Sequence, residues 1–95
     1  MITPPAQIDG ATVLTVADLS HASATGRAKH IVKGEQQRDF TALAIAKYDS
    51  EAGFYLFYCD AEWRAVTDTY HETIEGAIAQ AEFEFAGVTF AEASG

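Results

Sequence analysis

Three consecutive segments in the middle of the sequence predict strands, and they constrain the fold more than any other feature. The first alternates between two sets of side chains, as a strand does, and the second is apolar or aromatic on both faces, which is typical of a central strand. Turn-forming residues separate the three segments, with Gly53 available for a hairpin loop. The segments are Phe40–Tyr48, Phe54–Asp60 and Trp63–Thr69, and the turns are residues 49–53 and 60–62. We therefore predict an antiparallel β-meander.

An amphipathic helix is predicted after the meander, over residues 73–86. Apolar side chains recur there at spacings of three and four, which places them on one face of a helix. These side chains are Ile74, Ala77, Ile78, Ala81 and Phe85. Thr73 could cap the helix, or Thr69 could do so in a capping box with Glu72. Gly87 stands where a glycine commonly ends a helix.

The remaining segments add less to the prediction. Residues 11–19 are rich in β-branched residues and predict a first strand, whereas residues 20–26 predict a loop. Whether residues 27–33 form a short exposed strand is left open, and residues 88–90 could close the sheet. We expect one domain over residues 1–95, with residues 1–10 and 91–95 irregular. The predicted fold class is α+β, an antiparallel sheet of about four strands with one C-terminal helix packed on one face.

The size and composition of the chain suit one small globular domain. Its 95 residues are 48% hydrophobic and 12% aromatic, enough for one modest core. The only cysteine is Cys59, so an internal disulfide is impossible. The N-terminus has no signal-peptide pattern, and no apolar run approaches the roughly 18 residues of a membrane helix. We expect a soluble, cytoplasmic protein that does not contact a membrane.

The negative charge is concentrated in the second half of the sequence. The formal net charge is −8. Residues 1–47 carry five cations against four carboxylates, whereas residues 48–95 carry ten carboxylates against Arg64 alone. A phosphate backbone would be repelled by the second half, so we expect no nucleic-acid partner. A basic protein partner would be attracted to it.

Motifs of known catalytic chemistry are missing from the sequence. His71 and Glu75 are four residues apart and could share a cation on a helix, but a third ligand cannot be named, and a solvated helix start explains them better. Cys59 lies in an aromatic, acidic stretch, where a thiol packs in a core and is not activated as a nucleophile. We therefore expect no catalytic residue, no metal and no cofactor, and the residues favour a protein that is not an enzyme.

Surplus aromatic residues give the strongest functional signal. One helix covers only one face of a sheet, so the opposite face would expose Tyr55, Phe57 and Trp63, and such a patch needs a partner. In the alternative, residues 1–10 and 20–26 fold over this face. The expected partner-binding residues are these three aromatics and three carboxylates, namely Glu62, Asp68 and Glu72. Glu82 and Glu84 near the helix C-terminus extend the acidic surface at a small cost in helix stability.

The order of hairpin, third strand and helix over residues 40–86 resembles the N-terminal domain of HicB-type antitoxins. The helix start Thr73-Ile74-Glu75-Gly76-Ala77 is similar to the T-x-E-x-A start of that family. The PDLPGC-like segment of the family is replaced by residues 59–63 (CDAEW), and we expect no DNA-binding extension after the helix. In charge and size the chain is also similar to small acidic immunity proteins that neutralise bacterial toxins. Neither resemblance assigns a role to a residue.

Three functions remain open at this level. The first is a non-enzymatic, antitoxin- or immunity-like module that engages a basic protein partner. The second is a small-ligand-binding or enzymatic domain with a pocket between helix and sheet near Tyr58, Cys59 and His71. The third is a homodimer formed through exposed sheet faces or edges.

Overall fold

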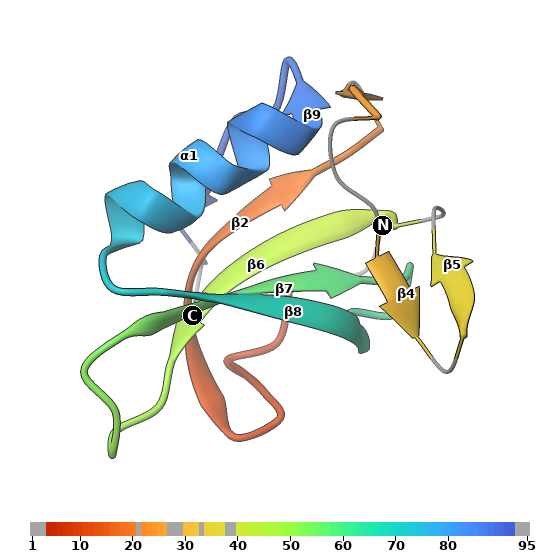
Figure 1. Cartoon of the computed structure of the whole chain (residues 1–95). Helices are drawn as coiled ribbons and strands as arrows, with labels where there is room; N and C mark the ends of the chain where they lie inside the picture. Colours follow the sequence, from red (N-terminus) through yellow and green to blue (C-terminus); the bar gives the residue numbers. More distant parts are fainter. Residues whose placement is uncertain (1–3, 21, 27–29, 33, 38–39, 93–95) are drawn as a thin grey trace.

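The structure is a curled antiparallel sheet with one helix across one face (Figure 1). It is a computed structural model, and it describes residues 4–20, 22–26, 30–32, 34–37 and 40–92. The sheet has six strands in the order β1-β2-β6-β7-β8, and β10 pairs with β2. Its strands are β1 (Gln7–Ile8), β2 (Ala11–Asp18), β6 (Ala42–Lys47), β7 (Phe54–Cys59), β8 (Ala65–His71) and β10 (Ala91–Glu92). The predicted α+β class is confirmed, but the prediction of about four strands is wrong.

The meander is present as strands β6, β7 and β8. Ala44 of β6 pairs with Phe57 of β7, which pairs in turn with Asp68 of β8. The third strand starts two residues later than predicted, because Trp63 belongs to the preceding turn and has a positive φ of 63°. The carboxylate of Asp60 stabilises this turn by accepting the backbone N–H of Glu62 at 2.9 Å and that of Arg64 at 3.0 Å.

The strands that the sequence pattern missed lie at the two ends of the chain. Residues 7–8 and 91–92 pair with different halves of β2, although both regions were expected to be irregular. Asp9 and Gly10 join β1 to β2, with φ values of 50° and 86° that fit a tight hairpin turn. β10 begins three residues after the start of the predicted closing segment 88–90. Two-residue strands have no hydrophobic periodicity of their own, so sequence pattern cannot reveal them.

The helix α1 spans Ile74–Glu84 and is capped by Thr73, whose hydroxyl accepts the N–H of Gly76 at 3.0 Å. Thr69 is a strand residue, so the alternative capping box does not form. The helix ends two residues before the predicted end because Phe85–Ala86 form a short strand, β9, that pairs with β3 (Ser23–Ala24). Gly87 has a φ of 84° and follows β9 directly.

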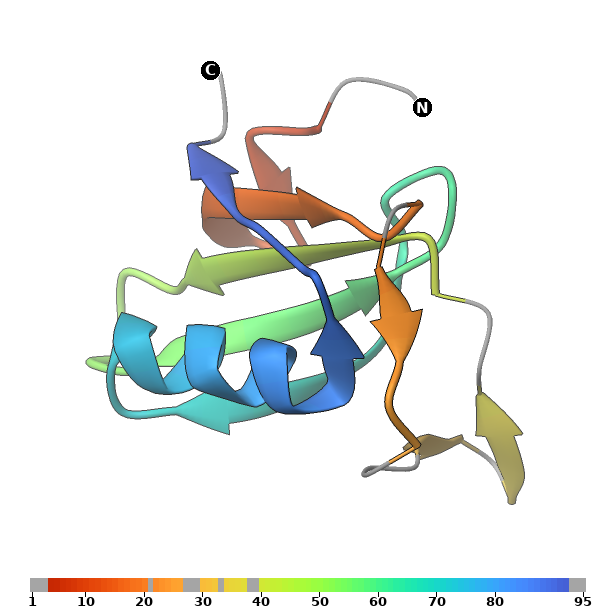
Figure 2. The same ribbon diagram turned by 90° about the horizontal axis from the view of Figure 1, so that it is seen from above.

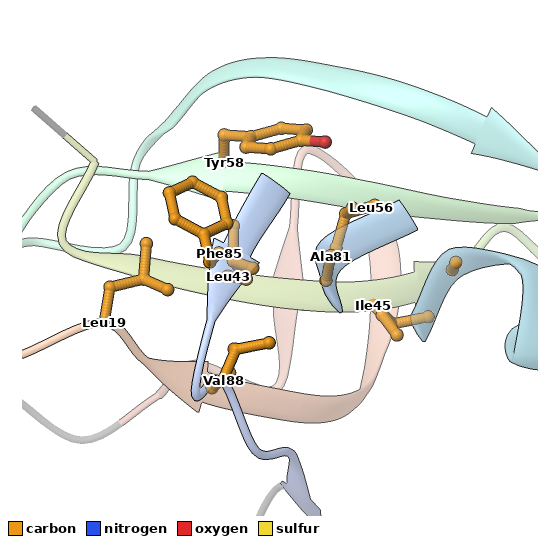
Figure 3. Close-up of a cluster of buried hydrophobic side chains, with 10 residues drawn as sticks. Leu19, Leu43, Ile45, Leu56, Tyr58, Ala81, Phe85 and Val88 are labelled. Atoms are coloured by element: carbon orange, nitrogen blue, oxygen red, sulfur yellow. The ribbon is translucent and has the colours of Figure 1, made fainter. Parts of the chain in front are cut away.

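One hydrophobic cluster lies between the helix and the sheet. Leu43, Ile45, Leu56 and Tyr58 point from β6 and β7 towards α1, as Figure 3 shows. The helix contributes Ala77 and Ala81, and the segments on either side contribute further side chains. These further buried side chains are Ala17, Leu19, Phe85 and Val88. The predicted apolar stripe therefore faces the sheet, with Ile74 and Ile78 packed against the cluster.

A second hydrophobic cluster fills the opposite, concave side of the sheet. Ala42, Ala44 and Ala46 give β6 a narrow face there, so the strands on either side can approach each other as the sheet curls into a half-barrel. Larger side chains from both sides of β6 fill the space inside the curl. The members are Ile8, Ala11, Val13, Phe57, Cys59 and Trp63 together with the three alanines. The curl thus buries a face that a second helix would otherwise have to cover.

A small hairpin stands off the end of the main sheet (Figure 2). It consists of β4 (His30–Val32) and β5 (Glu35–Gln37), with Gly34 at a φ of 81° in the turn. The open question about a strand at residues 27–33 is answered for 30–32, whereas residues 27–29 and 33 lie outside the described residues. The helix α1, the one helix among the described residues, is too short to cross a membrane.

Candidate interaction surface: the tyrosine–carboxylate face

Three tyrosine rings form a row along one end of the concave side of the sheet. Tyr48 follows β6, Tyr55 lies on β7, and Tyr70 lies on β8 directly opposite Tyr55. The Tyr48 and Tyr55 rings are 5.4 Å apart at 86°, and the Tyr55 and Tyr70 rings are 5.3 Å apart at 69°. Edge-to-face contacts of this kind are favourable between aromatic rings. Tyr70 is 51% exposed, so the row ends at the molecular surface.

Three exposed carboxylates accompany these rings. Glu51 accepts a hydrogen bond from the Tyr55 hydroxyl at 2.9 Å, and the Tyr48 hydroxyl donates to the backbone carbonyl of Asp9, also at 2.9 Å. Asp68 pairs with Phe57 across the sheet and therefore projects on the same side as the rings. We call the set Asp9, Tyr48, Glu51, Tyr55, Asp68 and Tyr70 the tyrosine–carboxylate face.

The negative potential of this face perturbs its own groups. Burial, followed by the charges of Asp9, Asp68 and Glu51, raises the pKa of Tyr48 above its ordinary value. The hydrogen bond to Glu51 is the largest cause of the raised pKa of Tyr55. Burial and then the charge of Asp9 raise the pKa of Asp68. The charge of Asp9 therefore disfavours the ionised form of Asp68, and a bound cation would offset this effect.

None of these three carboxylates forms an ion pair within the part of the chain that the structure describes. The cation nearest along the chain, Lys47, donates its ammonium group to the carbonyl of Tyr48 at 3.3 Å. Arg64 is bound to Asp60 and Glu62 in the turn before β8. The face consequently combines aromatic rings with carboxylates that no described cation pairs with, two features that favour a cationic ligand.

The structure buries two of the predicted partner-binding aromatic residues and leaves the third partly exposed. Phe57 and Trp63 were expected on an exposed patch, but they are only 2% and 5% exposed and belong to the concave core. Ile8 packs in the same cluster, so the alternative interpretation holds for the described part of residues 1–10. It is wrong for the described part of residues 20–26, where Ala22 packs against the helix-side cluster and β3 pairs with β9. Tyr55 is half-buried and lies in the tyrosine–carboxylate face together with Asp68. An exposed patch made of Tyr55, Phe57 and Trp63 does not exist.

The other two predicted carboxylates lie at opposite ends of β8. Glu62 precedes the strand, is exposed, and forms an ion pair with Arg64 at 2.7 Å. Glu72 follows the strand and is exposed in the connection to the helix. The seven residues of β8 separate them by roughly 20 Å. Glu62, Asp68 and Glu72 therefore do not form one compact acidic cluster.

A second polar cluster is buried between the helix and the sheet. Glu84 was expected on the acidic surface, but it is only 4% exposed. Its carboxylate accepts hydrogen bonds from the hydroxyl of Tyr58 and from the amide of Gln80, the latter at 2.8 Å. Burial and the bond to Glu84 raise the pKa of Tyr58 strongly. Glu82, by contrast, is exposed as expected.

The residues proposed for a ligand pocket are only partly brought together. Tyr58 and His71 share the helix side of the sheet, and Nε2 of His71 lies 2.8 Å from the hydroxyl of Thr69. Burial lowers the pKa of His71, and the charge of Glu84 partly offsets this effect. Cys59 points to the opposite, concave side, where burial raises the pKa of its thiol to about 12. The thiol therefore cannot act together with Tyr58 and His71.

Metal binding gains no support from the geometry. His71 ends β8 and Glu75 lies in the first turn of α1, so the two residues are not one turn apart on a helix. Within the described ranges, no group of three or more histidine, cysteine, aspartate or glutamate side chains is placed to hold a metal ion.

Four of the six members of the face were not among the predicted partner-binding residues, namely Asp9, Tyr48, Glu51 and Tyr70. Tyr48 ends an alternating strand, and Asp9 lies in a recognisable turn, but only the closure of β1 onto β2 brings them together. Comparison of the chain with protein-family models, with curated proteins and with solved structures gives no match.

Proposed function

We propose that this chain is a non-enzymatic protein-binding module whose tyrosine–carboxylate face engages a basic protein partner. The supporting observation is the juxtaposition of three carboxylates, which have no ion-pair partner among the described residues, with three partly or well exposed tyrosine rings. Lysine and arginine side chains can pair with carboxylates and also stack on aromatic rings, so a single face serves both interactions. Neutralisation of a basic protein, as by an antitoxin or immunity protein, is the concrete form of this role.

The charge distribution favours a basic partner over a second copy of the chain. Each copy carries a net charge of −8, and ten of its carboxylates lie in residues 48–95. Two copies docked through this face would bring Asp9, Glu51 and Asp68 of each against the same residues of the other. Like charges placed opposite each other destabilise an interface, whereas a basic partner is attracted and its encounter is accelerated.

The buried cluster around Glu84 does not favour the alternative ligand-binding or enzymatic function. Its hydrogen bonds join β7 to the helix, as expected of a polar network that fixes the packing of two elements. The thiol of Cys59, which that function would use, lies on the other side of the sheet.

Charge reversal at matched positions tests the proposal. Asp68→Lys removes a carboxylate from the face, whereas Glu82→Lys changes the net charge equally on an exposed helix position outside it. We expect wild type and Glu82→Lys to retain one stoichiometric basic protein from host lysate at low salt, and Asp68→Lys to lose it. Retention at high salt, or equal capture by Asp68→Lys, would contradict the proposal.

Glu62→Lys provides a further comparison, because Glu62 is already paired with Arg64 and lies beyond the far end of β8. We expect this variant to weaken capture less than Asp68→Lys does. A larger loss for Glu62→Lys would move the binding site to the turn before β8.

A further inference from the structure

The strand β8 is an edge of the main sheet. Among the described residues it pairs with β7 alone, and Figure 2 shows it as the outermost strand on the side away from β2. The hairpin strand β4 comes near β8 without pairing with it. An edge strand presents unpaired backbone groups that can bond to another extended chain. β8 is long enough, at seven residues, to accept such a chain.

The register of the sheet indicates which backbone groups face outward. The N–H of Leu19 donates to the carbonyl of Thr41 at 3.0 Å, so the odd-numbered residues of β6 bond to β2 and the even-numbered ones to β7. The odd-numbered residues of β7 therefore bond to β6, and its even-numbered residues bond to β8. Leu56 of β7 pairs with Thr69, so Thr69 is one of the residues of β8 whose backbone bonds to β7. Asp68 and Tyr70 then direct their backbone N–H and C=O groups away from the sheet.

The same two residues carry side chains of the tyrosine–carboxylate face. An incoming strand that bonds to the backbone of Asp68 and Tyr70 would place its own side chains beside theirs, about 5 Å away. A cation opposite Asp68 would meet a carboxylate whose charge is not paired within the described residues. A cation two positions along the incoming strand would lie near the ring of Tyr70, which is 51% exposed.

We propose that β8 accepts an extended basic segment of a partner protein as an added antiparallel strand, hydrogen-bonded to the backbone of Asp68 and Tyr70. The segment carries lysine or arginine at every second position, so that its cations lie on the side of Asp68, Tyr70 and the neighbouring carboxylates. An antiparallel arrangement matches every other strand pair of this sheet. This inference rests on the proposed function and specifies the form of the partner.

A synthetic peptide with alternating residues provides the direct test. The probe is a fluorescent, end-capped Thr-Lys-Val-Lys-Val-Lys-Thr peptide, titrated with the full chain at low salt while anisotropy is measured. In the proposed arrangement the lysine amides face β8 and the valine amides face solvent. N-methylation of the lysine amides should weaken binding roughly tenfold more than N-methylation of the valine amides, because only the first removes interchain hydrogen bonds. Equal weakening would overturn strand addition.

Proline substitutions test the same geometry from the side of the protein. Asp68→Pro removes an outward N–H, and Asp68→Ala removes the same carboxylate but keeps that N–H. We expect weaker peptide binding by Asp68→Pro than by Asp68→Ala, with both variants folded. Hydrogen exchange on the wild type requires no mutation: the amides of Asp68 and Tyr70 should exchange faster than that of Thr69 and become protected when the peptide binds. Fast exchange at Thr69, or no added protection, would overturn the proposal.

The outcomes separate this inference from the proposed function. Binding could be sensitive to salt and lost in Asp68→Lys, yet be weakened equally by N-methylation at either set of positions. That result would support the acidic protein-binding module and contradict strand addition. Absence of peptide binding at low salt would count against both. A dimer of the free chain that Asp68→Pro abolishes would assign the edge to a second copy and overturn the basic-segment proposal.

Discussion

The ring of Tyr70 on β8 lies directly over Gly53, the last residue of the loop before β7. A Cβ atom built on Gly53 would lie 2.1 Å from the hydroxyl oxygen of Tyr70 and 2.3 Å from the ring carbon that carries it. Gly53 itself is buried although Tyr70 is half-exposed. The Tyr70 ring can therefore pack against the backbone at residue 53 only because Gly53 has no side chain.

Gly53→Ala should displace the Tyr70 ring into solvent. Because the ring can rotate outward, we expect a loss of about 1 kcal/mol in the free energy of unfolding, together with weaker partner binding. In a Tyr70→Ala background the clash is absent, so Gly53→Ala should be neutral or stabilise by a few tenths of a kcal/mol. Urea unfolding of the four proteins in this double-mutant cycle measures the coupling. Additive effects would show that the two residues are not in contact in solution.

The hydroxyl of Tyr58 should matter for stability far more than that of Tyr70. Tyr58→Phe removes a donor to the buried carboxylate of Glu84, which we expect to cost about 1–3 kcal/mol of unfolding free energy. Tyr70→Phe removes a hydroxyl at an exposed position and is the matched control, with an expected change below about 0.5 kcal/mol. Thermal and urea unfolding measure both variants. Equal stability of the two would mean that the Tyr58–Glu84 bond contributes nothing to the fold.

Local pattern predicted the meander and the helix correctly because both depend on periodicity within one segment. The alternation in β6 and the capping of the helix by Thr73 are two examples. The curl of the sheet depends on how β1 and the turn at Trp63 meet over the small alanine face, and no single segment contains that information. Consequently Phe57 and Trp63 were placed on the surface by a prediction that assumed an open sheet.

The members of the candidate site likewise include some residues that local sequence pattern predicted and others that only the tertiary fold brings together. Asp68 and Tyr55 were predicted from the excess of carboxylates and aromatic residues in the second half of the sequence. Asp9 joins them only through the tight turn between β1 and β2, about 40 residues earlier in the chain than Tyr48. Glu84 was assigned to the acidic surface because charge normally indicates exposure. Its burial depends on Tyr58, 26 residues away, which sequence alone did not link to it.

The thiol of Cys59 should be almost inert in the folded protein. It is fully buried in the concave core, and burial, with smaller contributions from Asp60 and Asp9, raises its pKa to about 12. Little thiolate is present at neutral pH, and a reagent cannot reach it without local opening. We expect modification by a colorimetric disulfide reagent to be slow in buffer and to accelerate with urea in step with unfolding. Rapid modification of the native chain would place Cys59 at the surface.

Acid should weaken the turn between β7 and β8. Backbone N–H donation by Arg64 is the largest cause of the lowered pKa of Asp60, and the Arg64 side chain adds to it with a contact of 2.9 Å. A carboxyl whose pKa is lower in the folded state stabilises the fold when it is ionised. That contribution is complete above the ordinary pKa of about 3.9 and is lost as the pH falls through the lower, folded value.

Asp60→Ala therefore should destabilise the chain at neutral pH, and the difference from wild type should shrink in acid. Urea unfolding from pH 6 down to about pH 3 measures this dependence, since only the wild type loses the contribution of Asp60 over that range. Asp49→Ala, in an exposed turn, is the control and should leave stability unchanged within about 0.5 kcal/mol at each pH. A difference between wild type and Asp60→Ala that stays constant with pH would show that the ionised carboxylate does not stabilise the turn, and the burial of Trp63 would then depend on packing alone.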